Sequence, residues 1–423
     1  MKRDLWNQIF EKYAILEHIK NDGKYEITSK TINEFREARL MTKFDNASQL
    51  PLIFSEHKLS ILPITRGSYV IAPMDTFCQF PTLDHSTEIT YINFPETIQS
   101  LSPETITSEA LALNAAYLSG IFKDFIDDEN LFPTVSGKMS SQTFNFKIMN
   151  LLTKNEMHLA VDKALIEIDA GYEGVENLLI LEAKNHVADD FIIRQLYYPF
   201  RRLLESGIHK NIRTVFMVYT NNTFHLYEYI FSDPSRYNSL QLKNFKRYRF
   251  EKLSITSGDI ERILKNAVVE KEPSIPFPQA DSFERVINLC ELLYKTPLTK
   301  TDITKEYGFD KRQTDYYVNA GKYLGLIKEI EGKTLALSDL GQKIMSATPT
   351  RKQLKFAEII LKHSVFNEVL KQQMKTGTIL SKNEIIAIMK QQNLFKVTSE
   401  ETYGRRASTI RSWIDWITSL TVL

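Results

Sequence analysis

The sequence has very little cysteine. Only Cys78 and Cys290 occur among its 423 residues, and neither has a cluster of cysteine or histidine beside it. A disulfide framework needs several paired cysteines, and a structural zinc site needs four closely spaced ligands. The sequence therefore argues against a disulfide-rich scaffold and against a zinc site, and it predicts two reduced, buried thiols.

Long apolar runs are also missing. No segment approaches the roughly eighteen apolar residues that identify a membrane span, and the start, Met1–Trp6, lacks the apolar stretch of a signal peptide. We therefore expect a cytoplasmic protein that makes no membrane contact.

An excess of one charge is absent as well. The chain has 53 Lys and Arg against 52 Asp and Glu, which gives a net charge of +1. Such a balance offers no general attraction for nucleic acid, so binding of DNA would depend on local clusters of cations. The composition, 43% hydrophobic and 25% charged, is that of a folded protein, and the length suits two to four domains of roughly 100–200 residues.

Two apolar segments in the middle of the chain carry acidic residues and a lysine. Residues 165–171 (LIEIDAG) and 178–185 (LLILEAKN) are both predicted to be strands. Because strand side chains alternate between faces, Glu182 and Lys184 share one face. Burying them unpaired would cost several kcal/mol. A divalent cation held by Asp169 and Glu182 would compensate for this, with Lys184 beside it.

The pattern of Asp169 followed by Glu182-Ala183-Lys184 resembles the active site of the PD-(D/E)XK nuclease superfamily. A helix that starts within 191–201 (FIIRQLYYPFR) follows the second strand, as in many type II restriction endonucleases. The resemblance covers roughly residues 160–202, and segments 39–45 and 137–144 also look like parts of such enzymes. The chain departs from the family pattern in one respect, because Ile168 stands where the family has proline.

The resemblance implies a role for each of these residues. Asp169, Glu182 and the backbone carbonyl of Ala183 would bind Mg²⁺, and Lys184 would orient the attacking water or help to deprotonate it. A helix over 107–122 is predicted before the strands, and its Glu109 would reach the metal site; alternatively, Glu109 only favours the helix N-terminus. Gln195 is expected to have a positioning role, although a solvated Gln195 would fit the pattern too.

Several cationic and polar positions are candidates for DNA binding. Arg201 and Arg202 follow the catalytic segment, although a solvated helix face would explain them equally. In the stretch 243–252, Lys246, Arg247 and Arg249 alternate with aromatic residues, a composition that neutralises phosphates and stacks on bases. The alternative for this stretch is an edge strand with a solvated basic face.

The C-terminal part, beyond a proline-rich linker at 270–278, is predicted to be helical. Helices over 283–293, 299–307 and 310–324, with a hairpin over 326–337, resemble a winged helix. It would serve either as a DNA reader or as a dimerisation module. The DNA-reading candidates in its third helix are Lys311, Arg312, Gln313, Thr314 and Tyr317. The last helix of the chain supplies Arg405, Arg406, Ser408, Thr409 and Arg411, unless it is simply a charged surface helix.

Together these features predict an α/β (mixed α+β) fold with a restriction-endonuclease-like core. Four domains are expected: an N-terminal α+β domain (1–95) that is a candidate DNA reader or a brace for the core, the catalytic domain (96–270), a winged-helix domain (280–348) and a second winged-helix-like domain (351–423).

The expected function is that of a type II restriction endonuclease. It would make Mg²⁺-dependent, site-specific double-strand breaks in DNA, act as a homodimer, and work with the cognate DNA methyltransferase that the resemblance implies. The alternatives are a repair or recombination nuclease of the same superfamily and a non-enzymatic winged-helix regulator.

Overall fold

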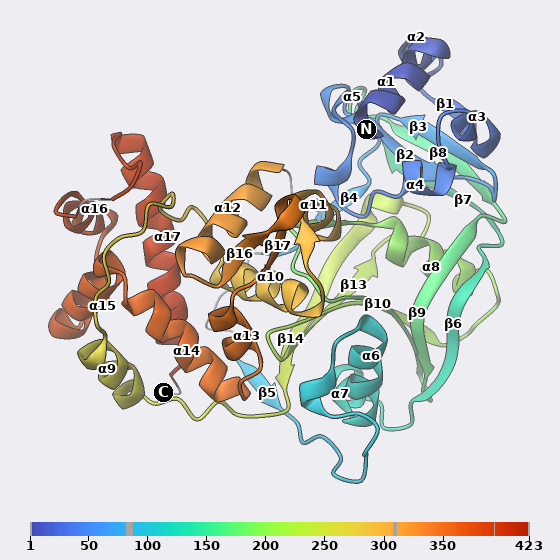
Figure 1. Ribbon diagram of the computed structural model, residues 1–423. Coiled ribbons are helices and arrows are strands. Elements are labelled where there is room, and N and C mark those ends of the chain that lie inside the picture. Colours follow the sequence, from blue (N-terminus) through green and yellow to red (C-terminus); the bar gives the residue numbers. More distant parts are fainter. Residues whose placement is uncertain (1, 82–87, 308–310, 393, 422–423) are drawn as a thin grey trace.

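A mixed β-sheet runs through the middle of the molecule (Figure 1). The computed structural model describes residues 2–81, 88–307, 311–392 and 394–421. Within these residues, seven strands pair in the order β5-β14-β13-β12-β10-β9-β6. Their bounds are β5 (Ile89–Tyr91), β6 (Phe132–Ser140), β9 (Leu165–Glu173), β10 (Asn177–Lys184), β12 (Asn211–Thr220), β13 (Thr223–Phe231) and β14 (Leu240–Arg249). The mixture of helices and strands confirms the predicted α/β (mixed α+β) class.

Helices cover both faces of this sheet (Figure 1). Helices α6 (Glu109–Leu118) and α7 (Ile121–Ile126) lie on one face, and α8 (Arg194–Leu204) lies on the other. Odd-numbered side chains of β10 pack in the same core as α6 and α7, whereas Leu178 and Ile180 pack against Leu203 of α8. Strand alternation therefore places the acid and the lysine of β10 on the face that α8 covers.

The helix predicted over 107–122 ends earlier than expected. Gly120 has φ of 81°, a left-handed backbone conformation that glycine adopts without a steric penalty, and the chain turns there from α6 into α7. The turn lets both short helices pack on the same side of the sheet.

The N-terminal part has a core of its own around Trp6. Its elements are α1 (Lys2–Lys12), α2 (Ile15–Asp22), β1 (Tyr25–Thr28), α3 (Ser29–Asn33), α4 (Ala38–Thr42), α5 (Leu52–Glu56), β2 (Ser60–Pro63) and β3 (Ser68–Ala72). The next strands belong with the middle of the molecule: β4 (Phe77–Gln79) pairs with β11 (Asp190–Ile192), and β5 pairs with β14. Strands β4 and β5 thus belong to the central part, although they lie before residue 95, where the sequence predicted the end of the N-terminal domain.

A hairpin of β7 (Thr143–Met149) and β8 (Glu156–Asp162) joins the N-terminal part to the outside of α8. Side chains from β2, β3, the hairpin and α8 form one buried cluster. The N-terminal part therefore packs against the central part through this buried cluster.

The C-terminal part begins before the proline-rich linker. Its elements are α9 (Ser257–Asn266), α10 (Phe283–Lys295), β15 (Leu298–Thr299), α11 (Lys300–Tyr307), α12 (Lys311–Tyr323), β16 (Ile327–Ile330), β17 (Thr334–Leu337), α13 (Asp339–Met345), α14 (Pro349–Leu361), α15 (Ser364–Thr376), α16 (Lys382–Lys390) and α17 (Glu400–Ser419). Position 310, the predicted start of the third helix, lies outside the described residues. Strands β15, β17 and β16 form a small sheet beside α10, α11 and α12.

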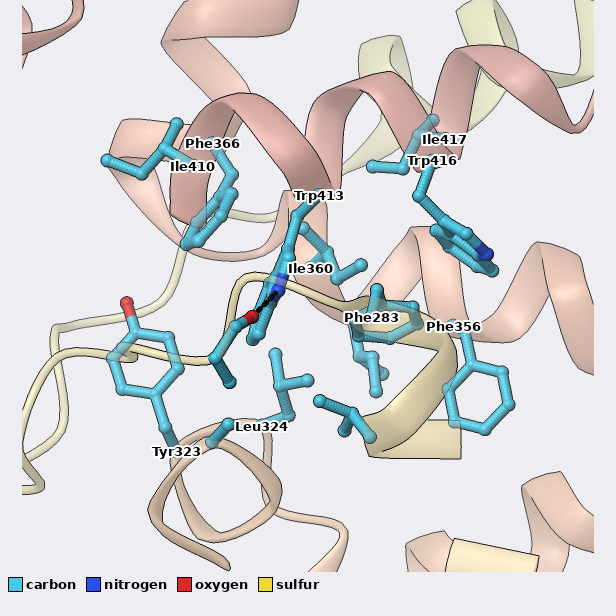
Figure 2. Packing of buried hydrophobic residues seen from close by; sticks show 14 of the residues in the cluster. Phe283, Tyr323, Leu324, Phe356, Ile360, Phe366, Ile410, Trp413, Trp416 and Ile417 are labelled. Atoms are coloured by element: carbon cyan, nitrogen blue, oxygen red, sulfur yellow. Dashed lines mark hydrogen bonds between the residues drawn. The ribbon is translucent and has the colours of Figure 1, made fainter. Parts of the chain in front are cut away.

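In the last part of the chain, α14, α16 and α17 lie where the sequence predicted helices, and α15 is an additional helix between them. One hydrophobic core runs from Leu253 to Leu420 and joins α9 and both predicted C-terminal domains. Figure 2 shows its centre, where Trp413 donates a hydrogen bond of 2.7 Å to the carbonyl of Ala280. Prolines in the linker prevent regular structure there, but its Phe277 is still buried in this core.

No helix in the described residues has both the length and the apolar character that crossing a membrane requires.

Trp413→Ala should destabilise the protein by about 3–5 kcal/mol, because it leaves a large cavity in the shared C-terminal core. Chemical denaturation followed by circular dichroism measures the change. Lys371→Ala, at an exposed position on α15, is the control and should stay within about 0.5 kcal/mol of the wild type. A Trp413→Ala protein as stable as the control would contradict the single-core description.

Candidate active site

Asp169 and Glu182 lie close together at the end of the β9–β10 ladder. The last pair of this ladder is Ala170 with Leu181, and Asp169 and Glu182 are the next residue on each strand. The charge of Asp169 acts on Glu182. An Asp169 carboxylate oxygen also accepts a hydrogen bond of 2.8 Å from the backbone N–H of Ala183. The fold thus brings together the two acids that the sequence singled out.

Glu182 is buried and bonded on one oxygen. Its Oε1 accepts hydrogen bonds of 2.5 Å from Lys184 Nζ and from Gln195 Nε2. Burial raises the pKa of Glu182 to about 7; the nearby charge of Lys184 opposes this, and the charges of Asp169 and Asp45 add to it. Gln195 therefore contacts the Glu182 carboxylate, and its positioning role stays a prediction.

Lys184 lies among three carboxyl groups. Burial on its own lowers the pKa of Lys184, but the charges of Glu182, Glu109 and Asp169 raise it well above its ordinary value. The ammonium group also donates a hydrogen bond of 3.2 Å to the carbonyl of Ala183. Lys184 is thus a cation at neutral pH in this structure.

Glu109 reaches the same group of charges from α6. It is the first residue of that helix, directly after the N-cap Ser108. Burial raises the pKa of Glu109, while Lys184 and the backbone N–H of Asn185 both act to lower it. The structure therefore places Glu109 at a helix N-terminus and also within the electrostatic reach of Lys184.

The N-terminal part contributes Asp45, the last residue of segment 39–45, which was not predicted to be a site residue. Its backbone carbonyl accepts a hydrogen bond of 2.9 Å from Ile192, and the next residues, Asn46 and Ala47, are bonded to Asp190. These bonds hold Asp45 close enough to Glu182 for its charge to raise the pKa of that residue. Asp45 is far from the catalytic segment in sequence. The likeness of segment 39–45 to such enzymes defines no motif that would identify Asp45 as a site residue.

The oxygen donors at this site suit Mg²⁺. Carboxylate and carbonyl oxygens are its preferred protein ligands, and Mg²⁺ commonly uses one or two carboxylates and keeps several waters. Among the described residues, no three His, Cys, Asp or Glu side chains gather closely enough to bind a metal on their own. The residues that fit are Asp169, Glu182 and the carbonyl of Ala183. A nearby cation would also stabilise the ionised form of Glu182, whose pKa burial has raised.

Arg201 does not fit the predicted contact with DNA phosphate. Its guanidinium group is buried, and it donates hydrogen bonds to the carbonyls of Asn145 (2.8 Å) and Pro234 (3.1 Å) and pairs with Glu205 at 2.7 Å. These contacts brace α8 against its surroundings. Arg202 is half-buried and donates to the carbonyl of Ser140 at 3.1 Å.

The basic and aromatic stretch forms part of β14, which pairs with β13 from Leu240 to Tyr248 but with β5 only over Arg247–Arg249. In the described sheet, therefore, only the last residues of β14 have a strand on both sides. Arg247 is buried, and Arg249 donates a hydrogen bond of 2.7 Å to Thr223. Lys246 is half-buried and pairs with Asp124 at 3.2 Å. The stretch is mainly structural because sheet pairing places its arginines inside the protein.

Helix α12 presents only part of its predicted DNA-binding set. The side chain of Lys311 lies outside the described part of the chain. Arg312 is exposed, and Gln313 donates a hydrogen bond of 3.3 Å to Asp189. Thr314 and Tyr317 lie on the buried face of the helix, so the prediction of groove contacts for these two was wrong.

The DNA-binding residues predicted on helix α17 are also partly exposed and partly buried. Arg405, Ser408 and Arg411 are exposed. Arg406 donates to Gln279, and Thr409 is fully buried and donates a hydrogen bond of 2.6 Å to Asp281. The contact predicted for Thr409 was therefore wrong, because this position faces the shared core.

Two consecutive aspartates, Asp189 and Asp190, connect the three parts of the molecule beside the site. Asp189 pairs with Arg285 of α10 at 2.5 Å. Asp190 accepts a hydrogen bond of 3.0 Å from the backbone N–H of Ala47. Neighbouring residues thus bind the C-terminal and the N-terminal part.

Comparison with known proteins gives three matches to protein-family models, all described as domains of unknown function. They are DUF6996 over residues 3–71, DUF6997 over 72–249 and DUF7226 over 285–422. The candidate active-site strands lie within the second match, and the third spans both predicted C-terminal domains. No curated protein and no solved structure matches the chain.

Lys184→Met should make the stability of the protein more dependent on pH. Without the ammonium group, the pKa of Glu182 rises further above its unfolded value, so stability is retained at low pH and lost as pH rises through the folded pKa. We expect an additional loss of about 1.4 kcal/mol for each unit by which that pKa rises. Urea unfolding between about pH 5 and pH 9, on either side of the Glu182 pKa of about 7, measures this loss of stability.

The control for this prediction is the double variant Glu182→Gln/Lys184→Met, which should lose most of the added pH dependence. Parallel stability curves for the wild type and Lys184→Met would show that Lys184 does not compensate for Glu182.

Proposed function

We propose that this protein is a Mg²⁺-dependent endonuclease that hydrolyses phosphodiester bonds in double-stranded DNA. The observation that carries the proposal is the meeting of Asp169, Glu182 and Lys184 on one face of β9 and β10, with Glu109 beside them. Asp169, Glu182 and Lys184 are the residues on which the resemblance to the PD-(D/E)XK superfamily rests.

The order of the surrounding elements supports the same proposal. Helix α6 comes before the strands, β9 and β10 are antiparallel neighbours, and α8 follows and leads into β12, which is parallel to β10. A crossover through a helix is the usual way to connect two parallel strands. A strand pair followed by a helix is the arrangement that the resemblance implies.

The residues of the chain would divide the chemistry among them. Asp169, Glu182 and the carbonyl of Ala183 would hold Mg²⁺, which supplies Lewis-acid activation of water and neutralises charge on the phosphate. Gln195 fixes one oxygen of Glu182 and so orients the carboxylate. Lys184, as a cation, would donate a hydrogen bond to a phosphate oxygen or to the attacking water and stabilise the charge that develops in the transition state.

The raised pKa of Lys184 favours this electrostatic role over that of a general base. A base must be able to accept a proton near the working pH. Mg²⁺ bound to these carboxylates would offset part of their negative charge. The pKa of Lys184 would then be raised less than it is without the ion.

DNA recognition is assigned to the C-terminal part. The order of α10, β15, α11, α12, β16 and β17 resembles that of a winged helix. Exposed candidates for contacts with DNA in this part are Arg312 on α12 and Arg405, Ser408 and Arg411 on α17. Because one such site cuts one strand at a time, we propose a homodimer acting at a symmetric target as a type II restriction endonuclease, with a cognate methyltransferase.

A non-enzymatic DNA-binding regulator is the second candidate. It is favoured by the mutual compensation of the buried charges, because Lys184 pairs with Glu182 at 2.5 Å and Asp169 is bonded to the backbone. Such a cluster could serve stability alone. A nuclease of repair or recombination would share the active site and differ in its DNA substrate.

Lys184→Ala should lower Mg²⁺-dependent cleavage of plasmid DNA by roughly 10²–10⁴-fold and leave DNA binding unchanged, because it removes charge stabilisation in the transition state. Gel assays of cleavage and of DNA binding measure the two effects. The control Lys210→Ala removes an ion pair with Glu173 on the same sheet, at 2.7 Å, and should cleave at the wild-type rate.

Each result of the cleavage assay separates the candidates. Fragments with discrete, mappable ends support the restriction endonuclease, and diffuse or junction-specific cutting supports the other nucleases. Cleavage that survives Lys184→Ala would reject the assigned site, and a wild type that binds but never cuts DNA would support the regulator.

Mg²⁺ affinity should increase with pH up to about 7, because Glu182 must lose its proton before it can bind the ion. Below this pH the association constant should fall by at most about tenfold per pH unit. Isothermal titration calorimetry with Mg²⁺ measures it. Glu182→Gln should bind more weakly at every pH; a wild-type affinity that does not change with pH would contradict a role for Glu182 as ligand.

A further inference from the structure

Helix α10 of the C-terminal part is bonded directly to the segment that follows the active-site strand. Asn288 on this helix is 2% exposed. Its side-chain oxygen accepts a hydrogen bond of 3.2 Å from the backbone N–H of Val187, and its side-chain nitrogen donates one of 3.0 Å to the carbonyl of Asn185. The side-chain amide of Asn288 thus makes the same two kinds of hydrogen bond with this backbone, one accepted and one donated, that a neighbouring β-strand makes.

The position of this contact ties it to the candidate active site. Asn185 directly follows Lys184, and its backbone N–H interacts with the Glu109 carboxyl group. The carbonyl of Asn185 is held by Asn288. Since Lys184 is attached to this backbone, its direction depends on the contact with Asn288.

Two further bonds fasten the end of the same segment. Arg285 on α10 pairs with Asp189 at 2.5 Å, and Gln313 on α12 donates to the other carboxylate oxygen of Asp189 at 3.3 Å. Residues 185–189 are thus attached to the C-terminal part at both ends. These bonds fix the position of the segment relative to α10 and α12.

We infer that Asn288 is a positioning residue for the proposed nuclease reaction. It acts through the backbone at Asn185 and holds Lys184 in the direction that catalysis requires, so cleavage depends on a helix outside the catalytic sheet. The inference rests on the proposed function and adds a residue that lies outside the PD-(D/E)XK resemblance.

The chain offers a matched control at Gln353. This residue is also an amide, also 2% exposed and also on a C-terminal helix, and it donates a hydrogen bond of 2.7 Å to Asn221 in the turn between β12 and β13. Gln353→Ala therefore removes a comparable buried contact with the central part, but one that does not hold the segment after Lys184.

The test compares Asn288→Ala and Gln353→Ala in the full chain, with plasmid DNA and Mg²⁺. Asn288→Ala should lower kcat by roughly 10–100-fold, the usual range for the loss of an orienting contact, with KM and DNA binding unchanged. Gln353→Ala should keep kcat within about twofold of the wild type. Thermal unfolding of both variants shows whether they are comparably destabilised.

Asn288→Asp gives a readout that stability alone would not produce. The amide nitrogen of Asn288 also donates a hydrogen bond of 3.0 Å to Glu291. Aspartate has the same shape as asparagine, but its ionised form would repel Glu291 and cannot donate to the carbonyl of Asn185, whereas its protonated form can donate. The kcat deficit relative to the wild type should therefore become smaller as pH falls.

Three results would overturn the inference: an unchanged kcat in Asn288→Ala, equal losses of kcat in Asn288→Ala and Gln353→Ala, or a change confined to KM. A wild-type protein that cleaves no DNA would reject the proposed function itself, and the positioning role with it. Wild-type cleavage with an unaffected Asn288→Ala would reject the positioning role alone.

Discussion

The burial of Glu182 and Lys184 at the end of β10 is the constraint on which the rest of the site depends. A strand covered by helices on both faces offers little water to solvate charge, so each charged group needs a protein partner or an ion. The partners come from separate regions: Asp169 from β9, Glu109 from α6, Gln195 from α8 and Asp45 from the N-terminal part. Compensation of buried charge thus explains why distant segments of the chain meet at this point.

The sequence was sufficient where local rules decide the structure. Alternation along β10 predicted that Glu182 and Lys184 share a face, and the short interval between the strands predicted their pairing with the segment of Asp169. Asp45 could not be predicted in this way. Its place depends on tertiary hydrogen bonds to β11, which no local pattern encodes.

The predicted DNA contacts show a related limit. Thr314, Tyr317 and Thr409 were chosen as polar residues near helix starts, yet all three face the core, where a hydroxyl group can be buried if it finds a partner. Arg201 likewise has a long side chain whose charged end is satisfied by backbone carbonyls. Polar character alone does not reveal which face of a helix meets solvent when the helix packs against another part of the chain. The sequence also did not reveal the shared core of the C-terminal helices. A proline-rich linker predicts a break in regular structure, but the segments on either side of it can still pack together.

The adjacent Asp189 and Asp190 have a consequence for how this chain can evolve. Each binds a different flanking part, so the catalytic, N-terminal and C-terminal parts all contact a single dipeptide. Inserting or deleting one residue next to Asp189 would move Asp189 or Asp190 out of register with its partner. The two side chains would then point to the opposite parts of the molecule. The three regions are therefore poorly suited to recombination as independent modules, and compatible changes would have to arise together in all of them.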